Sequence, residues 1–219
     1  MDEPSDVELL DAWADGDEAA GRTLYRRHCD KLTDFVARKT DHDVADVVQR
    51  AFAGCLQARR GGTTIAAPRA YLYRSVRNAL YDGFARDDRT VALDPSQQSL
   101  ADLGTGPQTH ALRNQAQAQL LEALRRIPLD DQVALELCYW EGLGMVEVAD
   151  VLGVGRSAAI SRVHRARARL RAALVRNGGS EARAEATVTS FESWQEKLRS
   201  DPSSPVYVEE PGNDAGDRD

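Results

Sequence analysis

Two glycine clusters interrupt the helical pattern between Asp130 and Val175, and this punctuation limits the possible folds more than any other feature. The clusters are Gly142-Leu143-Gly144 and Gly153-Val154-Gly155. Gly153 suits a turn because glycine adopts a left-handed backbone at little cost. A short helix, a tight turn and a longer arginine-rich helix form the helix-turn-helix arrangement, whose second helix lies in the DNA major groove. The helices predicted here are 130–141, 145–152 and 156–175.

On a helical wheel, the last of these helices separates its apolar side chains from most of its arginines. The stripe expected to face the core is Ala159, Val163, Ala166, Leu170 and Leu174. Ser161 and Arg165 point the opposite way, and Arg162 and Arg169 flank that outer face. Arg167 and Arg171 lie nearer the core edge, where salt bridges to neighbouring helices are expected. The residues predicted to meet DNA are Arg156, Ser157, Ser161, Arg162 and Arg165 at the bases, and Arg169 and Arg176 at phosphates.

The charge distribution supports a nucleic-acid partner, although the net charge of −7 does not. Gly153–Arg176 contains seven arginines and no carboxylate. Negative charge gathers at the ends: Met1–Glu18 has eight acidic and no basic residues, and Asn177–Asp219 has ten acidic against four basic. Arginine is the usual cation of this chain, which explains the choice of cation but not the lack of acids. An acid-free arginine segment is more typical of a phosphate-binding surface than of a merely solvated helix face.

The N-terminal part reads as four further amphipathic helices. The first carries the apolar residues of Leu9–Trp13, Asp17 caps the second, Asp43 opens the third, and the fourth runs from Pro68 to about Phe84. No segment alternates as a strand, so the predicted fold is all-α. The predicted organisation is two small helical bundles, residues 5–89 and 115–176, joined by a flexible linker, 90–114, and followed by an acidic, largely disordered tail, 177–219.

The segment Pro68–Arg86 interleaves three tyrosines and four arginines around an apolar stripe of Leu72, Val76 and Leu80. Aromatic rings stack on unpaired bases while arginines hold the backbone, a combination that suits single-stranded nucleic acid. Ordinary amphipathic packing is the alternative, and these residues taken alone favour it.

Eight motifs occur in order along the two bundles. They are Gly16-Asp17-Glu18-Ala19-Ala20, Leu24-Tyr25-Arg26-Arg27, Asp46–Phe52 and Ala70–Asn78 in the first, and Leu124–Pro128, Tyr139–Leu143, Glu147–Val154 and Ser161–Arg167 in the second. This ordered set resembles a bacterial RNA polymerase sigma factor of the extracytoplasmic-function (ECF) type in the sigma-70 family, which keeps only the second and fourth conserved regions. The resemblance covers about residues 5–89 and 115–176.

The resemblance implies a promoter-specificity subunit whose second bundle reads the minus-thirty-five element and whose first bundle captures an unpaired minus-ten base. The implied partners are core RNA polymerase, through its β′ clamp and β flap, promoter DNA, and an anti-sigma factor or other regulator. The implied polymerase-binding residues are Asp46, Gln49 and Arg50. The implied minus-ten residues are Arg60, Thr63, Arg69, Tyr71, Tyr73, Arg74, Arg77 and Asn78. The alternative function is a free-standing helix-turn-helix regulator, which would predict a dimer and a palindromic site.

The chain departs from the family pattern at four places. Arg50 replaces a glutamate on the helix expected to grip polymerase, and Gly21 replaces an aromatic residue. Ser157–Ile160 replaces a Gly-Thr-Val-Lys sequence in the recognition helix, and Gly144 is a weaker cap than serine or threonine by a few tenths of a kcal/mol. These departures bear on promoter choice and on the strength of polymerase binding.

No motif indicates an enzyme, a cofactor or a metal site. His28-Cys29 is the sole adjacent His/Cys pair, and the other cysteines and histidines lack structural-zinc spacing. Three cysteines fit a reducing cytoplasm, and no apolar run exceeds four residues, so no membrane insertion is expected. In the tail, Val188, Phe191, Trp194 and Leu198 form a short apolar helix face. The tail either folds back on the arginine-rich helix and weakens DNA binding, or stays solvated and aids solubility.

Overall fold

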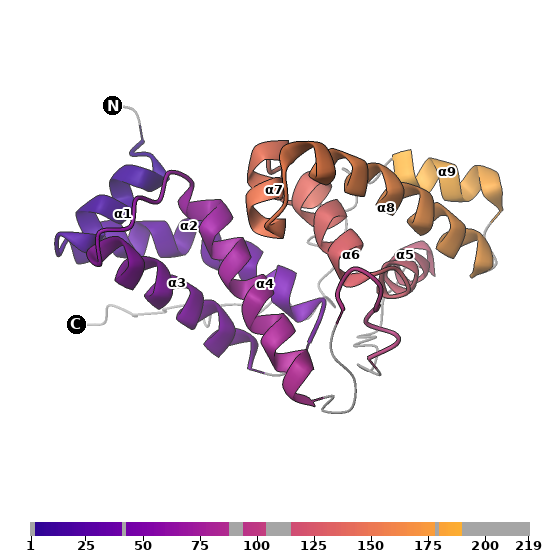
Figure 1. Ribbon diagram of the computed structural model, residues 1–219, viewed down its shortest axis with the longest axis horizontal. Coiled ribbons are helices and arrows are strands. Elements are labelled where there is room, and N and C mark those ends of the chain that lie inside the picture. Colours follow the sequence, from indigo (N-terminus) through magenta and orange to yellow (C-terminus); the bar gives the residue numbers. More distant parts are fainter. Residues whose placement is uncertain (1–2, 41–42, 88–93, 104–114, 178–179, 190–219) are drawn as a thin grey trace, which may run out of the picture.

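The computed structural model describes residues 3–40, 43–87, 94–103, 115–177 and 180–189. Within these ranges every regular element is helical, and the only strand-like pairing is one isolated bridge between Ser99 and Pro128. The helices form two bundles that lie side by side (Figure 1). The all-α, two-bundle prediction is confirmed.

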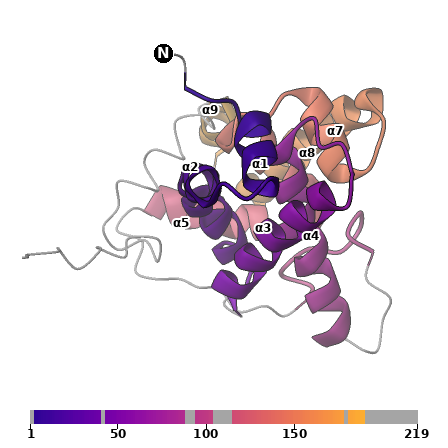
Figure 2. The same cartoon turned by 90° about the vertical axis from the view of Figure 1, so that its left-hand side faces the viewer.

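The first bundle contains four helices, seen with the N-terminal helix nearest the viewer in Figure 2. They are α1 (Asp6–Ala14), α2 (Glu18–Ala37), α3 (Val44–Arg60) and α4 (Pro68–Asp87). Asp17 caps α2 as expected: its Oδ1 accepts hydrogen bonds from the backbone N–H groups of Ala19 (2.8 Å) and Ala20 (3.1 Å). Asp43 stands before α3 with a left-handed backbone (φ 46°) and makes no side-chain cap.

Gly21, the family departure in α2, has a structural reason. A Cβ atom placed there would lie 2.5 Å from the Trp13 indole, so the ring of α1 fills the space that a side chain at position 21 would need. Close contact between α1 and α2 therefore depends on glycine at this position.

The second bundle contains α5 (Gln115–Arg125), α6 (Leu129–Leu135), a π-helical turn η1 (Glu136–Trp140), α7 (Met145–Leu152), α8 (Arg156–Arg176) and α9 (Glu181–Thr189). The three predicted helices correspond to α6 with η1, to α7 and to α8. Gly153 ends α7 with φ 67°, the left-handed conformation expected for the turn. At the start of α7, Gly144 has no side chain to offer, but Glu147 accepts from its backbone N–H at 2.9 Å.

The region predicted to be a flexible linker is docked on the second bundle in its described part, residues 94–103. Leu129 N donates to Gln98 O (2.9 Å) and Ala101 N donates to Arg125 O (3.0 Å), while Leu100 is fully buried. The sequence shows no periodicity here because backbone hydrogen bonds to α5 and α6, rather than a helix of its own, hold the segment.

The start of the tail also has structure, in a region expected to be largely disordered. Helix α9 lies against the C-terminal half of α8 (Figure 1), and its Ala184 and Val188 are buried. Arg171 of α8 pairs with Glu185 at 3.4 Å, as the wheel predicted for an arginine near the core edge. The other apolar tail residues, Phe191, Trp194 and Leu198, lie outside the described residues.

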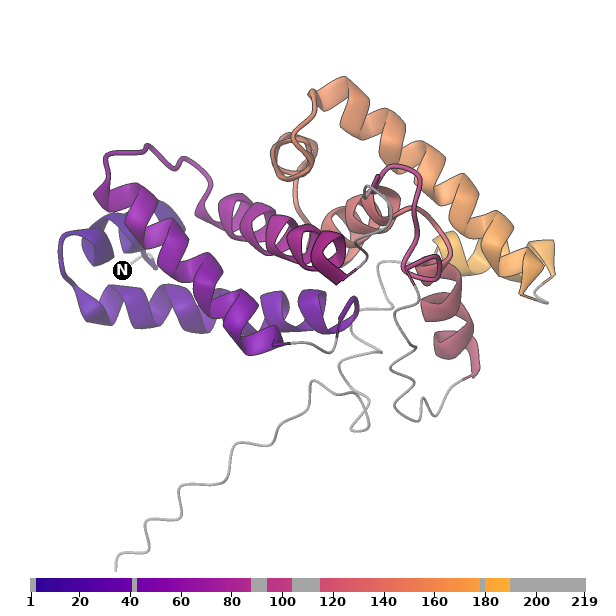
Figure 3. The same ribbon diagram turned by 60° about the horizontal axis from the view of Figure 1, so that its bottom comes forward.

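The two bundles touch through α4 and α7 and through the end of α2 against η1 (Figure 3). None of the helices in the described part of the chain is long and apolar enough to cross a membrane.

Candidate nucleic-acid interface

Helix α8 presents one exposed face and buries the other. The five residues of the predicted core stripe are all buried, which fixes the helix by its apolar side. Six of the seven residues of α8 predicted to contact DNA are exposed, and only Arg162 is partly buried. The exposed residues are Arg156, Ser157, Ser161, Arg165, Arg169 and Arg176. Together with the absence of acidic side chains on α8, this gives a continuous basic and hydroxyl-bearing face suited to base edges and phosphates.

Two predicted DNA contacts on α8 are already engaged within the protein. Arg162 Nη1 donates to Asp130 Oδ2 at 2.7 Å, and the arginine side chain is only 18% exposed. Arg169 pairs with the carboxylate of Asp131. The Asp131 side chain is almost fully buried, whereas the Arg169 side chain is 48% exposed. The wheel placed both arginines on the flanks of the outer face but could not show that α6 carries two carboxylates beside them.

Sequence reasoning missed two residues on the reading face. Ile160 is 43% exposed, one of two large apolar side chains that are exposed in the described part of the chain, and His164 is exposed one turn further on. The helical wheel could have identified both residues. Ile160 lies one residue before Ser161 and four before His164, so both fall outside the core stripe.

The loop from Arg59 to Thr64 connects α3 to the segment before α4. Gly62 has φ 90°, and Thr63 N donates to Ala58 O at 3.0 Å, so the loop is held tightly against the end of α3. Arg60 is exposed, with its Nε donating to Ala14 O at 3.2 Å, and the Thr63 side chain is also exposed. Both predicted minus-ten residues of this loop are therefore accessible.

Helix α4 keeps part of its predicted minus-ten set accessible. Arg74 and Asn78 are exposed, and the Arg74 guanidinium lies 5.3 Å from the centre of the half-buried Tyr71 ring. Arg69 is half-buried, with Nη2 enclosed and without a hydrogen-bond partner among the described residues.

Tyr73 and Arg77 differ from the prediction, since both face the second bundle. Tyr73 is buried, and its hydroxyl donates to Glu141 Oε2 at 2.6 Å. Arg77 Nη2 donates to Asp130 Oδ1 at 2.7 Å, and its side chain is only 14% exposed. Neither can meet a base in this arrangement, because the second bundle covers both side chains. The sequence could not indicate which side of α4 the second bundle covers.

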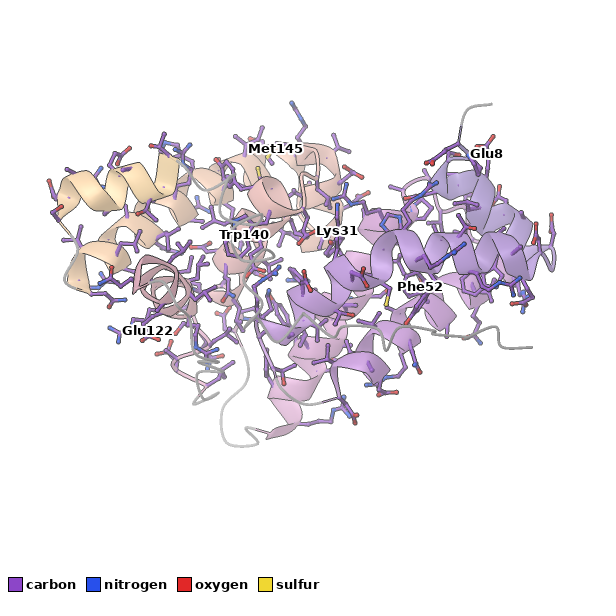
Figure 4. The ribbon with its side chains drawn as sticks, turned by 180° about the vertical axis from the view of Figure 1, so that it is seen from behind. Glu8, Lys31, Phe52, Glu122, Trp140 and Met145 are labelled. Atoms are coloured by element: carbon purple, nitrogen blue, oxygen red, sulfur yellow. The ribbon has the colours of Figure 1, made fainter. Side chains whose placement is uncertain are left out.

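The junction between the bundles is a buried cluster of opposite charges. It lies in the middle of the molecule, where Trp140 is seen close to the end of α2 (Figure 4). Glu136 Oε2 accepts from Arg38 Nε (2.9 Å) and Lys39 Nζ (2.8 Å), and both Lys39 and Glu136 are fully buried. Glu141 accepts from Tyr73 and pairs with Arg38 at 3.4 Å.

Burial and charge oppose each other in this cluster. Burial lowers the pKa of Lys39 to about 8, and the nearby Glu136 only partly restores it. Burial alone would raise the pKa of Glu136, but the neighbouring Lys39 and Arg38 outweigh it and lower that pKa below its usual value. For Tyr73, burial and the adjacent Glu141 both raise the pKa of the phenol. Burial therefore weakens the charge on Lys39, whereas the neighbouring cations favour the charged form of Glu136.

The candidate polymerase surface lies on the first two turns of α3, in the first bundle (Figure 1). Asp46, Gln49 and Arg50 are exposed and lie on adjacent turns. Arg50 Nη2 pairs with Asp46 Oδ2 at 2.7 Å, so the arginine that replaces the family's glutamate also covers a neighbouring carboxylate. Across the ranges that the structure describes, no group of three or more His, Cys, Asp or Glu side chains could hold a metal ion.

Comparison with known proteins places both bundles in one family. Residues 24–90 match the family model "Sigma-70 region 2" and residues 117–170 match "Sigma-70, region 4". The chain is 32% identical to the ECF RNA polymerase sigma factor SigM of Mycobacterium tuberculosis over 178 residues, 77% of this chain and 84% of that protein. It is 29% identical to the ECF sigma factor SigE of Mycolicibacterium smegmatis, over 83% of this chain and 72% of the relative.

A third relative, the RNA polymerase sigma factor NccH of Alcaligenes xylosoxydans, is 30% identical over 80% of this chain and 97% of its own length. Sigma factors are transcription initiation factors that work with core RNA polymerase on promoter DNA, so the alternative of a free-standing regulator is not supported. With both conserved regions in order and relatives covered over most of their length, the chain belongs to the ECF type of the sigma-70 family, the promoter-specificity subunits of bacterial RNA polymerase.

Proposed function

We propose that the exposed face of α8 reads the minus-thirty-five element as duplex, and that the 59–64 loop with α4 captures an unpaired minus-ten base. The observation that carries the first part is the acid-free face formed by Arg156, Ser157, Ser161 and Arg165. The second part is supported by four exposed residues: Arg60 and Thr63 before α4, and Arg74 and Asn78 in its first three turns.

Polymerase binding is proposed to use α3, with Asp46, Gln49 and Arg50 meeting the β′ clamp and the second bundle meeting the β flap. An anti-sigma factor or another regulator is proposed to control the chain, which acts in the cytoplasm.

The test is gel filtration of the purified chain with core RNA polymerase, followed by transcription mapped across the source genome. Co-migration and discrete start sites are expected; failure with several bacterial cores would contradict the proposal.

Arg165→Ala is expected to weaken binding to the minus-thirty-five element while polymerase binding stays intact. A bidentate arginine contact to guanine contributes roughly 1–3 kcal/mol, so affinity should fall about tenfold or more. Fluorescence anisotropy with the holoenzyme measures the change. The matched control is Arg126→Ala, which removes the same charge from the residue after α5, where Arg126 pairs with Glu122. Equal affinities for the two variants would show that Arg165 does not face DNA.

Ile160 is expected to contact the methyl group of a thymine, since it is an exposed aliphatic side chain beside Ser161 on the reading face. Burying one methyl group is worth about 0.8 kcal/mol, so replacing that thymine by deoxyuridine should weaken wild-type binding about fourfold. Ile160→Ala should bind both DNAs equally. Val146→Ala, which removes the second large apolar side chain exposed in the described ranges, should keep the wild-type preference. If no thymine position shows a methyl effect, Ile160 does not read the element.

A further inference from the structure

A hollow of about 400 Å³ opens on the surface between α1 and α2, and none of its residues belongs to the proposed DNA or polymerase contacts. The residues that line the hollow are Trp13, Glu18, Gly21, Arg22, Tyr25 and Arg26. The Trp13 indole can lie directly on α2 because Gly21 has no side chain. The volume falls within the usual range of ligand-binding pockets.

Aromatic and cationic side chains share this hollow. Trp13 and Tyr25 are half-buried, and the Tyr25 ring packs against Phe52 of α3, with 4.8 Å between the ring centres. Arg22 and Arg26 are exposed one turn apart on α2, and within the described ranges neither pairs with a carboxylate. Two aromatic rings beside two such guanidinium groups suit a ligand that carries an aromatic ring next to a negative charge.

One segment of this chain has that chemistry. Asp201–Asp219 contains six acidic residues and one basic residue, and its one aromatic residue is Tyr207, two positions before Glu209. Pro205 and Pro211 on either side favour an extended backbone, in which alternate side chains share a face. Tyr207 and Glu209 are therefore expected to place a ring and a carboxylate side by side.

We propose that the tail segment 205–211 docks in this hollow of its own chain. The Tyr207 ring packs against Trp13, and the Glu209 carboxylate pairs with the guanidinium groups of α2, which is how arginine clusters recognise acidic motifs. The hollow thus gives the tail a binding surface on the first bundle, away from the arginine-rich face of α8.

The chain is long enough to make this contact. Helix α9 turns back along α8, so the chain leaves α9 in the direction of the first bundle (Figure 1). Tyr207 lies 18 residues after Thr189, the end of α9, and an extended chain of that length spans up to about 60 Å. Because the segment and the hollow belong to one molecule, their effective concentration is of the order of millimolar, so a weak contact is sufficient.

A photoreactive residue in the full chain tests the contact. Tyr207→p-azidophenylalanine keeps a para-substituted ring of similar size, and mass spectrometry identifies the peptides to which it cross-links. The cross-links are expected within monomers, on the peptide that contains Trp13 or on residues 18–26. Cross-links elsewhere on the chain, including α8, cross-links between two copies, or no cross-links would overturn the proposal.

Charge variants test how the segment is recognised. Arg22→Gln should lower the cross-linking yield at least twofold, because the carboxylate loses a cation. Glu18→Gln, which removes the acid from the lining, should raise the yield. The matched control is Arg86→Gln, which removes the same charge from an exposed residue near the end of α4 and should leave the yield unchanged. Equal yields for Arg22→Gln and Arg86→Gln would contradict the proposed pairing.

A second measurement keeps the natural aromatic side chain in the reference protein. Tyr207→Ser should shift the NMR signal of the Trp13 indole N–H, assigned from Trp13→Phe, because an aromatic ring leaves its surroundings. The control is Val206→Ser, which changes a side chain on the opposite face of the extended segment and should not move the signal. An indole signal that Tyr207→Ser leaves unchanged would exclude packing of the tail against Trp13. Polymerase and promoter DNA take no part in either measurement, so the outcome is independent of the proposed function.

Discussion

Replacing Glu136 with alanine is expected to separate the two bundles while each stays folded. Among the residues that the structure describes, the change leaves the fully buried Lys39 with only the Phe35 carbonyl as a hydrogen-bond acceptor (3.0 Å). It leaves Arg38 with the longer Glu141 contact. Removing one partner of a buried ion pair costs about 3–5 kcal/mol. Because Lys39 regains water when the bundles part, separation relieves this penalty more easily than unfolding does.

Small-angle scattering and hydrogen exchange measure this result. The radius of gyration should rise, and protection should fall at the end of α2 and in η1, while the helical circular dichroism signal is retained. The control is Glu122→Ala, which breaks an exposed pair with Arg126 and should change stability by less than about 1 kcal/mol. Wild-type scattering and protection in Glu136→Ala would mean that apolar contacts, not this ion cluster, hold the bundles together.

Gly21→Phe is expected to destabilise the first bundle by roughly 1–3 kcal/mol or more, because overpacking forces neighbouring side chains and backbone to shift. The collision is with Trp13, whose indole lies 2.5 Å from the position a Cβ would take. Urea denaturation measures the loss. Adding Trp13→Ala should recover most of it, since the new aromatic ring then takes the space of the old one.

A second glycine gives the matched control. Gly54 lies inside α3, and a Cβ there would meet nothing within 4 Å, so Gly54→Ala should stabilise the chain by about 0.5–1 kcal/mol. Gly21→Ala should not show this gain. Equal stabilisation at both positions would mean that Trp13 moves aside freely and that glycine is not required between α1 and α2.

Much of the local structure followed from the sequence. Asp17 caps α2, Pro68 begins α4 and Gly153 ends α7 in a left-handed turn, because these signals act over one or two turns of chain. The apolar stripe of α8 was also identified, since helical periodicity sets which face is buried. Family membership was also predicted, because the order of the motifs along the chain still identifies the family where single positions depart from its pattern.

The partners of the charged side chains could not be predicted in this way. An arginine looks the same in the sequence whether it meets solvent, a phosphate or a carboxylate 32 positions away, as Arg162 does with Asp130. The docked segment 94–103 was likewise missed, because its backbone hydrogen bonds go to another part of the chain and leave no periodic signal. Both misses involve contacts between residues distant in sequence.

The sequence by itself therefore determined the helices, their caps, the two bundles and the family, all of which depend on local propensity and apolar periodicity. Only the tertiary structure decided which proposed DNA contacts are accessible. Arg156, Ser157, Ser161 and Arg165 remain on the surface, while Tyr73, Arg77 and Arg162 turn toward buried acids. The physical reason is that a buried charge is stable only when it is paired with an opposite charge or a hydrogen-bond partner. Which partner is within reach depends on how the two bundles pack.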